Sequence, residues 1–107
     1  METRIALAAL NAVAQESRLA VFRLLIRAGP PGMAASKIAK QLGIAPSSLS
    51  FHLKELTHAD LVTQKQEGRF VIYSANFATM NALIGFLTDN CCSENACIAT
   101  PAPPSTV

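Results

Sequence analysis

The 107-residue sequence lacks any run of about 20 apolar residues, the length that a membrane-spanning helix needs. It also lacks a normal secretory signal, because Glu2 and Asn11 interrupt its start and the apolar stretch 5–10 is short. Its three cysteines are not spread along the chain, as a disulfide framework requires, but lie within residues 91–97. These absences predict a protein of the reducing cytoplasm with no membrane partner.

Catalytic signatures are missing as well. The chain has no apparent Ser-His-Asp set, glycine-rich phosphate loop or paired-carboxylate motif. Its cysteines follow a predicted helix C-terminus and lie near Asp89 and Glu94, a setting that disfavours a reactive thiolate. We therefore expect a protein that is not an enzyme, and we reject a small cysteine oxidoreductase or arsenate reductase as the alternative.

Positive charge is absent from the last third of the chain. Residues 1–69 hold all nine Lys and Arg against five acids, a net charge of +4, whereas residues 70–107 hold only Asp89 and Glu94, a net charge of −2. This asymmetry is compatible with a nucleic-acid face in the first two thirds. The chain is also 50% hydrophobic and only 15% charged, so we expect one small domain that buries surplus apolar surface in a homodimer.

Hydrophobic periodicity predicts helices over 4–14, 15–28 and 34–42, and a fourth from Pro46. The first is apolar nearly all round, so we expect it to be covered on several sides through Ile5, Leu7, Leu10 and Val13. For the second we expect an inner stripe of Leu19, Phe22, Leu25 and Ile26.

After Leu61 the period changes from helical to two. Strands are predicted over 62–65 and 70–74, joined by the segment 66–69, and a last helix over 77–90. Three prolines in 100–107 predict a disordered end. The order of elements indicates a mainly α fold with a small β-hairpin (α+β), a dimeric winged helix-turn-helix. We assign 1–92 to this DNA-binding and dimerisation domain, and 93–107 to a cysteine-bearing, proline-rich flexible tail.

The helix that begins at Pro46 is the predicted recognition helix. Its N-terminal residues would face base edges in the major groove, while lysines and an arginine on neighbouring elements pair with phosphates. A solvated helix face is the alternative for each side chain, and His52 is equally suited to supporting the helix pair. The predicted DNA-binding residues are Lys37, Lys40, Ser47, Ser48, Ser50, Phe51, His52, Lys54, Lys65 and Arg69.

From Glu16 to Ser74 the chain resembles the ArsR/SmtB family of metal-responsive repressors. The resemblance is carried by the stretches Ile38-Ala39-Lys40-Gln41-Leu42-Gly43-Ile44, Ser47 to Leu56, and Gly68-Arg69-Phe70-Val71-Ile72-Tyr73-Ser74. It implies a homodimer built mainly from the first and last helices, which binds double-stranded operator DNA and is released by an inducer. Pro46 and Phe51 depart from the polar or basic residues of many relatives.

Two inducer sites of the family are missing from this chain. One subgroup has cysteines at the start of the helix-turn-helix, where this chain has Met33-Ala34-Ala35-Ser36. Zinc-sensing members use His and Asp on the last helix, which here offers only Asp89. The resemblance to arsenic repressors with C-terminal cysteines therefore points to the tail.

Cys91, Cys92 and Cys97 form a Cys-Cys-x4-Cys cluster after the last predicted helix. Thiolates prefer soft ions, and three of them suit trivalent arsenic or antimony, whereas zinc usually needs a fourth ligand. We therefore expect As(III) or Sb(III) as the inducer and no permanent cofactor. The alternatives are a cadmium or lead sensor, a thiol redox switch and incidental free thiols. A metal chaperone or protein-interaction module on the same scaffold is a further alternative.

Overall fold

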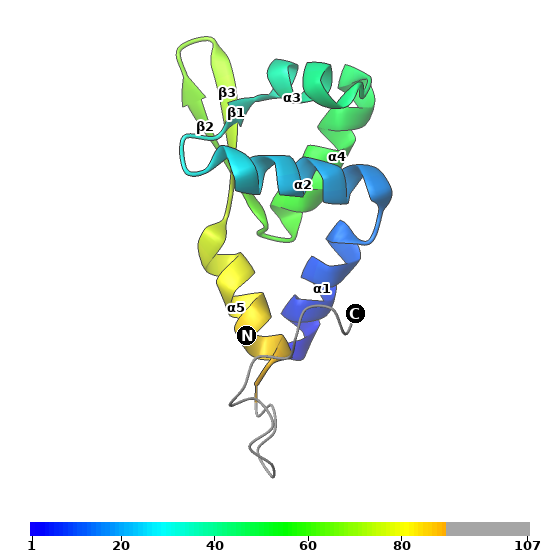
Figure 1. The fold of residues 1–107 in the computed structure, drawn as a ribbon, viewed down its shortest axis with the longest axis vertical. Helices are drawn as coiled ribbons and strands as arrows, with labels where there is room; N and C mark the ends of the chain where they lie inside the picture. Colours follow the sequence, from blue (N-terminus) through cyan, green and yellow to red (C-terminus); the bar gives the residue numbers. More distant parts are fainter. Residues whose placement is uncertain (90–107) are drawn as a thin grey trace, which may run out of the picture.

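The computed structural model describes residues 1–89 as five helices and a three-stranded sheet (Figure 1). The elements are α1 (Thr3–Val13), α2 (Glu16–Ala28), β1 (Met33–Ala34), α3 (Ala35–Leu42), α4 (Pro46–His58), β2 (Val62–Glu67), β3 (Phe70–Ala75) and α5 (Phe77–Leu87). This confirms the predicted winged helix-turn-helix. The predicted domain boundary at 92, the tail and the three cysteines lie outside the described residues.

The sheet contains a strand that the sequence analysis missed. Its order is β1-β3-β2, and both pairings are antiparallel. β1 pairs Met33 with Tyr73 and Ala34 with Ile72. The hairpin strands are longer than predicted, because Glu67 pairs with Phe70 and leaves only Gly68 and Arg69 in the turn. Gly68 has φ 62°, which suits glycine at the first position of such a two-residue turn.

The core lies between α2, α3, α4 and the base of the hairpin. Leu25, Ile38, Leu56 and Val62 are each almost completely buried there. Figure 1 shows α2 crossing the middle of the molecule, with the helix-turn-helix and the sheet on one side of it and α1 and α5 extending to the other. The predicted inner face of α2 is wrong in one residue, because Leu19 is exposed whereas Val21 and Leu24 are buried.

The first helix turns its small residues to the core. Ala6, Ala9 and Ala12 are buried, whereas Ile5 is 42% and Leu7 57% exposed. The expectation that the large apolar residues of this helix are covered is therefore wrong for Ile5 and Leu7 in the single chain, whereas Leu10 and Val13 are half-buried. Alanine has no side chain beyond Cβ, so α1 can approach α2 and α4 closely while its larger residues face outward.

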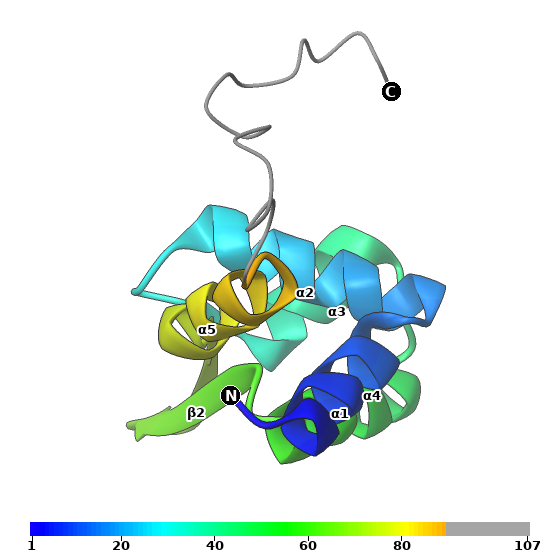
Figure 2. The same ribbon diagram turned by 90° about the horizontal axis from the view of Figure 1, so that it is seen from below.

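The last helix ends earlier than predicted, at Leu87 rather than Asn90. Its Ile84 and Leu87 are more than half exposed. α1 and α5 contact each other and are the elements nearest the viewer in Figure 2, which looks at the molecule from that end.

No single helix among residues 1–89 is long and apolar enough to cross a membrane. α1 and α2 together meet the length and composition criteria only as a pair bent by 100°.

Candidate nucleic-acid interface

The turn of the helix-turn-helix is built by Gly43, Ile44 and Ala45. Gly43 has φ 64°, in the left-handed region, and ends α3. The N–H of Ile44 then donates to the carbonyl of Ala39 over 3.1 Å, a bond that wraps the chain around the helix end. Pro46 follows at the first position of α4, where its missing N–H leaves no bond unmade. This local chemistry sets α4 across α3.

One face of α4 is fixed in the core, so the opposite face is presented to solvent. Leu49, Leu53 and Leu56 are each no more than 2% exposed. The remaining predicted residues of this helix apart from His52 are exposed, namely Ser47, Ser48, Ser50, Phe51 and Lys54. The structure thus places these residues on one accessible helix, and their contact with DNA stays a prediction.

The N-termini of α3 and α4 lack side-chain caps. Their N-cap residues are Ala34 and Ala45, which have no side-chain acceptor. Glu2 before α1 also makes no cap bond, whereas Gln15 and Asn76 cap α2 and α5 through the N–H groups of Arg18 and Thr79. The first N–H groups of a helix have no partner within it, and phosphate oxygens can accept from them. Both helices of the motif are therefore open to anions at their N-termini.

His52 and Phe51 form an aromatic pair on α4. Their ring centroids are 5.9 Å apart, with the planes at 63°, an edge-on arrangement. Phe51 is 55% exposed, so its ring offers apolar surface to a base methyl group. His52 is half-buried, and its Nδ1 is buried without a hydrogen-bond partner among the described residues. The predicted hydrogen-bond network between the two helices therefore does not include this nitrogen of His52.

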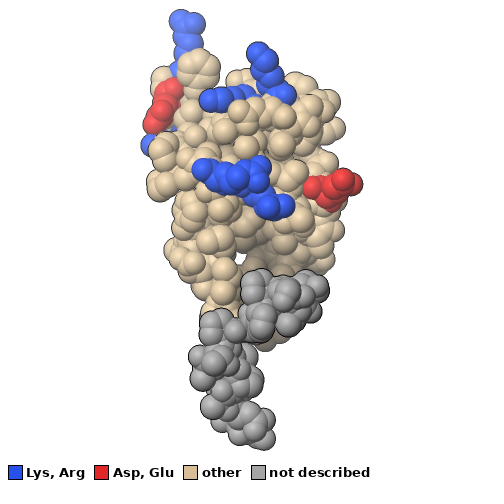
Figure 3. All heavy atoms as spheres, viewed as in Figure 1, with Lys and Arg blue, Asp and Glu red and all other residues tan. Residues whose placement is uncertain are grey.

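The hairpin β2–β3 is the wing. Arg69 lies in its turn, and Lys65 lies on β2, where its Nζ is 3.0 Å from Glu67 Oε2. Both partners are more than half exposed, so the ion pair is weak and a phosphate can compete for the lysine. Lys37 and Lys40 are exposed on α3. In Figure 3 the Lys and Arg atoms gather over the wing, the helix-turn-helix and α2.

Two polar residues of the wing were missed by the sequence analysis. Gln64 and Tyr73 are paired across β2 and β3, and they line a hollow of about 230 Å³ with Ser50, Lys54 and Thr57 of α4. The signal was available, because Gln64 lies two residues after the buried Val62 and so shares its face of the strand. These residues connect the surface of α4 with that of the wing.

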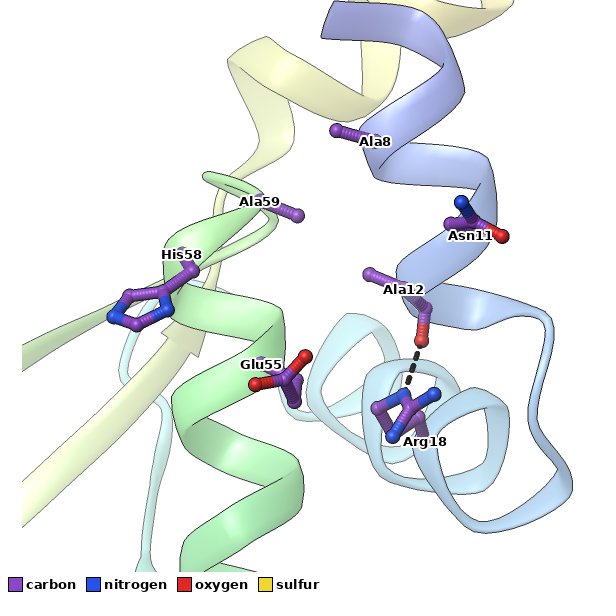
Figure 4. A pocket seen from close by; sticks show the side chains of 7 residues that line it. All are labelled: Ala8, Asn11, Ala12, Arg18, Glu55, His58 and Ala59. Atoms are coloured by element: carbon purple, nitrogen blue, oxygen red, sulfur yellow. Dashed lines mark hydrogen bonds between the residues drawn. The ribbon is translucent and has the colours of Figure 1, made fainter.

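A second hollow of about 360 Å³ lies between α1, α2 and α4, away from the wing (Figure 4). Arg18 Nε donates to the carbonyl of Ala12 over 2.7 Å and so ties α2 to the end of α1. The side chains of Glu55 and His58 line the same hollow from α4. Arg18 and Glu55 form no ion pair within 4.0 Å in the described chain.

Metal-ligating side chains do not converge in residues 1–89. No group of three His, Cys, Asp or Glu residues there could hold an ion. The predicted ligands Cys91, Cys92 and Cys97 lie outside the described residues, so the site that they would form stays a prediction.

Comparison with known proteins gives a family and relatives. A family model described as a helix-turn-helix domain matches residues 13–65, which include the whole of α2, α3 and α4. The nodulation protein NolR of Rhizobium meliloti is 28% identical over 82% of this chain and 70% of its own length.

Solved structures share the fold. HlyU from Vibrio cholerae is 28% identical and superposes with a TM-score of 0.67, over 86% of this chain and 99% of its own. An ArsR-like transcriptional regulator from Rhodococcus superposes with a TM-score of 0.68 over 92% and 96% at 24% identity, which speaks for the fold alone. A possible transcriptional regulator for arsenical resistance is 28% identical, with a TM-score of 0.61 over 75% and 83%.

Proposed function

We propose that this chain, which has a helix-turn-helix domain and the fold of transcriptional regulators, is a repressor of the ArsR family that binds its operator as a homodimer and is released by a trivalent metalloid. The matched helix-turn-helix domain and the relatives that are transcriptional regulators support the predicted class, a regulator and not an enzyme. The observation that supports DNA binding is the exposed face of α4. The uncapped N-termini of α3 and α4 and the lysine and arginine of the wing accompany this face.

The contacts divide into two kinds. Ser47, Ser48 and Ser50 enter the major groove with Phe51, where hydroxyl groups reach base edges and the ring reaches thymine methyl groups. The phosphates are bound by Lys37, Lys40, Lys54, Lys65 and Arg69, and by the free N–H groups at the start of α4. The phosphate contacts fix the position of α4 on the duplex, and the side chains in the major groove determine which base sequence is bound.

Salt dependence tests the phosphate contacts. The logarithm of the DNA-binding constant should fall linearly with the logarithm of salt concentration, and Arg69→Gln should lower the slope by about 1. Arg4→Gln is the matched control, because Arg4 lies on α1 and pairs only with Glu2, at 3.4 Å and with both side chains mostly exposed. An Arg69→Gln slope equal to that of the wild type would remove the wing from the DNA surface.

The homodimer is proposed to form through α1 and α5. These neighbouring helices expose Ile5, Leu7, Ile84 and Leu87 at the end of the molecule remote from the wing. Large apolar side chains that are exposed together on neighbouring helices are usually buried against a partner. With the helices of two chains packed there, both copies of α4 can face one side of a duplex.

A single charge on this surface tests the dimer. Ile84→Glu should convert the protein to a monomer in sedimentation velocity, because an unpaired carboxylate would be buried. Phe70→Glu is the matched control, since Phe70 is 60% exposed on the wing, and this variant should stay dimeric. A dimeric Ile84→Glu protein would exclude this interface.

The proposed inducer site consists of Cys91, Cys92 and Cys97, which follow α5 in the sequence. Three soft thiolates match the coordination of As(III) and Sb(III), and residues 1–89 offer no cysteine and no competing cluster. A relative described as a possible regulator for arsenical resistance supports the same ligand class. Inducer binding next to the dimer helix should weaken operator affinity by about 5- to 150-fold, the usual range of coupling between two sites.

Titration of the operator complex with arsenite tests the inducer. A gel shift on the protein's own promoter should show release of the wild type, and each single Cys→Ser variant should need more arsenite. Release by cadmium or lead salts but not by arsenite would support the first alternative, and release only by peroxide would support a redox switch. A complex that arsenite leaves intact would refute the metalloid proposal while leaving the DNA-binding proposal standing.

A further inference from the structure

Asp60 occupies a backbone position that suits glycine. It follows α4, has φ 64°, and is the one non-glycine residue with positive φ in the described chain. Its N–H donates to Thr57 O over 3.0 Å, and the N–H of Leu61 donates to Leu56 O over 3.0 Å. These two bonds form the Schellman motif, in which glycine is the usual residue. An aspartate is tolerated there, but the turn itself does not require its side chain.

The carboxylate of Asp60 binds the first turn of α5. Oδ2 accepts from Thr79 Oγ1 over 3.1 Å, and Oδ1 accepts from Asn76 Nδ2 over 3.4 Å. Thr79 is the one buried polar residue of the described chain, at 9% exposure. Asn76 in turn caps α5, since its Oδ1 accepts from Thr79 N over 3.2 Å, and its own N–H donates to Leu61 O over 2.8 Å. Three of these hydrogen bonds join the end of α4 to the start of α5, and the fourth, between Asn76 and Thr79, caps α5 itself.

The hydrogen bonds between Asp60, Asn76 and Thr79 set the direction in which α5 projects. In Figure 1 α5 projects from the base of the hairpin away from α4, and its far half has exposed apolar residues. Its 11 residues extend about 16 Å at 1.5 Å per residue. A rotation of about 10° at the junction would therefore move the far end by about 3 Å, close to the rise of about 3.4 Å per base pair along the axis of B-DNA.

We propose that Asp60 and Thr79 are positioning residues that fix the angle between α4 and α5, and with it the spacing of DNA half-sites that the dimer accepts. The inference rests on the proposed function, with α4 in the major groove and α5 in the dimer interface. It assigns no DNA contact to either residue. Asp60 and Thr79 instead hold the two recognition helices at one separation.

Half-site spacing is the measurement that tests this role. A palindromic duplex is first selected by the wild type from a randomised pool, and versions with one base pair added or removed between the half-sites are then prepared. The wild type should bind the altered duplexes about tenfold or more weakly, the loss typical of one wrong position in a site. Asp60→Gly keeps the backbone conformation and removes the carboxylate, and Thr79→Val keeps the shape and removes the hydroxyl. Both variants should reduce the discrimination to about threefold or less while remaining dimeric.

Two further variants control the experiment. Thr88→Val makes the same change in a hydroxyl that donates only to Ile84 O and Gly85 O, so it should keep the wild-type discrimination. Asp60→Asn keeps an acceptor and tolerates the backbone, so it should restore much of it. Wild-type discrimination in both Asp60→Gly and Thr79→Val would overturn the inference. A wild type that binds no duplex from the pool would instead overturn the proposed function.

Discussion

Gly32→Ala should destabilise the protein far more than an ordinary glycine substitution. Gly32 has φ 73° and lies where the loop before β1 crosses β3. A Cβ there would be 2.4 Å from the carbonyl oxygen of Tyr73 and 2.4 Å from Ser74 Oγ. Tyr73 lies in the central strand and is paired with both β1 and β2, so its carbonyl cannot move without disturbing the sheet. The loop must shift instead, which strains the bond from Ser74 Oγ to Pro30 O.

The magnitude has two parts. A left-handed conformation costs a residue with a side chain about 1–2 kcal/mol, and overpacking a closed contact costs about 1–3 kcal/mol more. The free energy of unfolding should therefore fall by about 2–5 kcal/mol. Gly43→Ala separates the parts, because Gly43 has φ 64° but a Cβ there would meet nothing within 4 Å. That variant should lose only the first part, about 1–2 kcal/mol.

Urea unfolding followed by far-UV circular dichroism measures both variants. The protein concentration must be the same throughout, because dimerisation stabilises the folded chain by mass action. A lower midpoint at unchanged slope reports stability alone. If Gly32→Ala costs no more than Gly43→Ala, the close approach of the loop to β3 does not limit the fold, and the reasoning is refuted.

Two other substitutions probe helix termini and interiors. Ala45→Ser supplies α4 with a neutral N-cap, so the free energy of unfolding should rise by about 0.5–2 kcal/mol. Operator affinity in gel shifts should fall, because the serine hydroxyl then occupies the N–H groups at the start of α4. Unchanged affinity would show that no phosphate binds there. Gly85→Ala lies within α5 with nothing within 4 Å of the new Cβ, so it should stabilise by about 0.5–1 kcal/mol in urea unfolding; a loss of stability would show that a partner chain approaches this glycine closely.

The fold was predictable where local chemistry and periodicity agree. Gly43 and Pro46 mark the end of one helix and the start of the next, and the structure has both boundaries there. The change to a period of two after Leu61 predicted the wing. β1 could not be found in this way, because a strand of two residues has no period and exists only through its pairing with Tyr73 and Ile72.

The first helix shows a different limit of sequence analysis. Ile5 and Leu7 were predicted to be covered, but they are exposed, and the alanines of the helix are buried instead. Periodicity identifies an apolar helix, but it cannot decide which of two apolar faces meets the core when both are available. Steric fit decides here, since alanine lets α1 approach its neighbours closely. The larger face then remains available for a second chain.

The candidate site was predictable as a helix face but not as a network. The exposed residues of α4 follow from the leucines at 49, 53 and 56, which define its buried side. Asp60 gave no such signal, because an aspartate between a helical pattern and a strand pattern is an ordinary turn residue. Only the folded chain shows its left-handed backbone and the hydroxyl of Thr79 at 3.1 Å.

The two opposite ends of the folded molecule each leave groups without a partner, but the groups differ in kind. At one end, α3 and α4 begin at alanines, which cannot accept from the first N–H groups, and the lysines of both helices are exposed. At the other end, α1 and α5 expose large apolar side chains. Uncapped N–H groups attract anions and exposed apolar surface attracts apolar surface, so the first end suits a phosphate backbone and the second suits another copy of the chain. A dimer that binds DNA satisfies both ends at once, and the hydrogen bonds of Asp60 and Thr79 lie on the path between them.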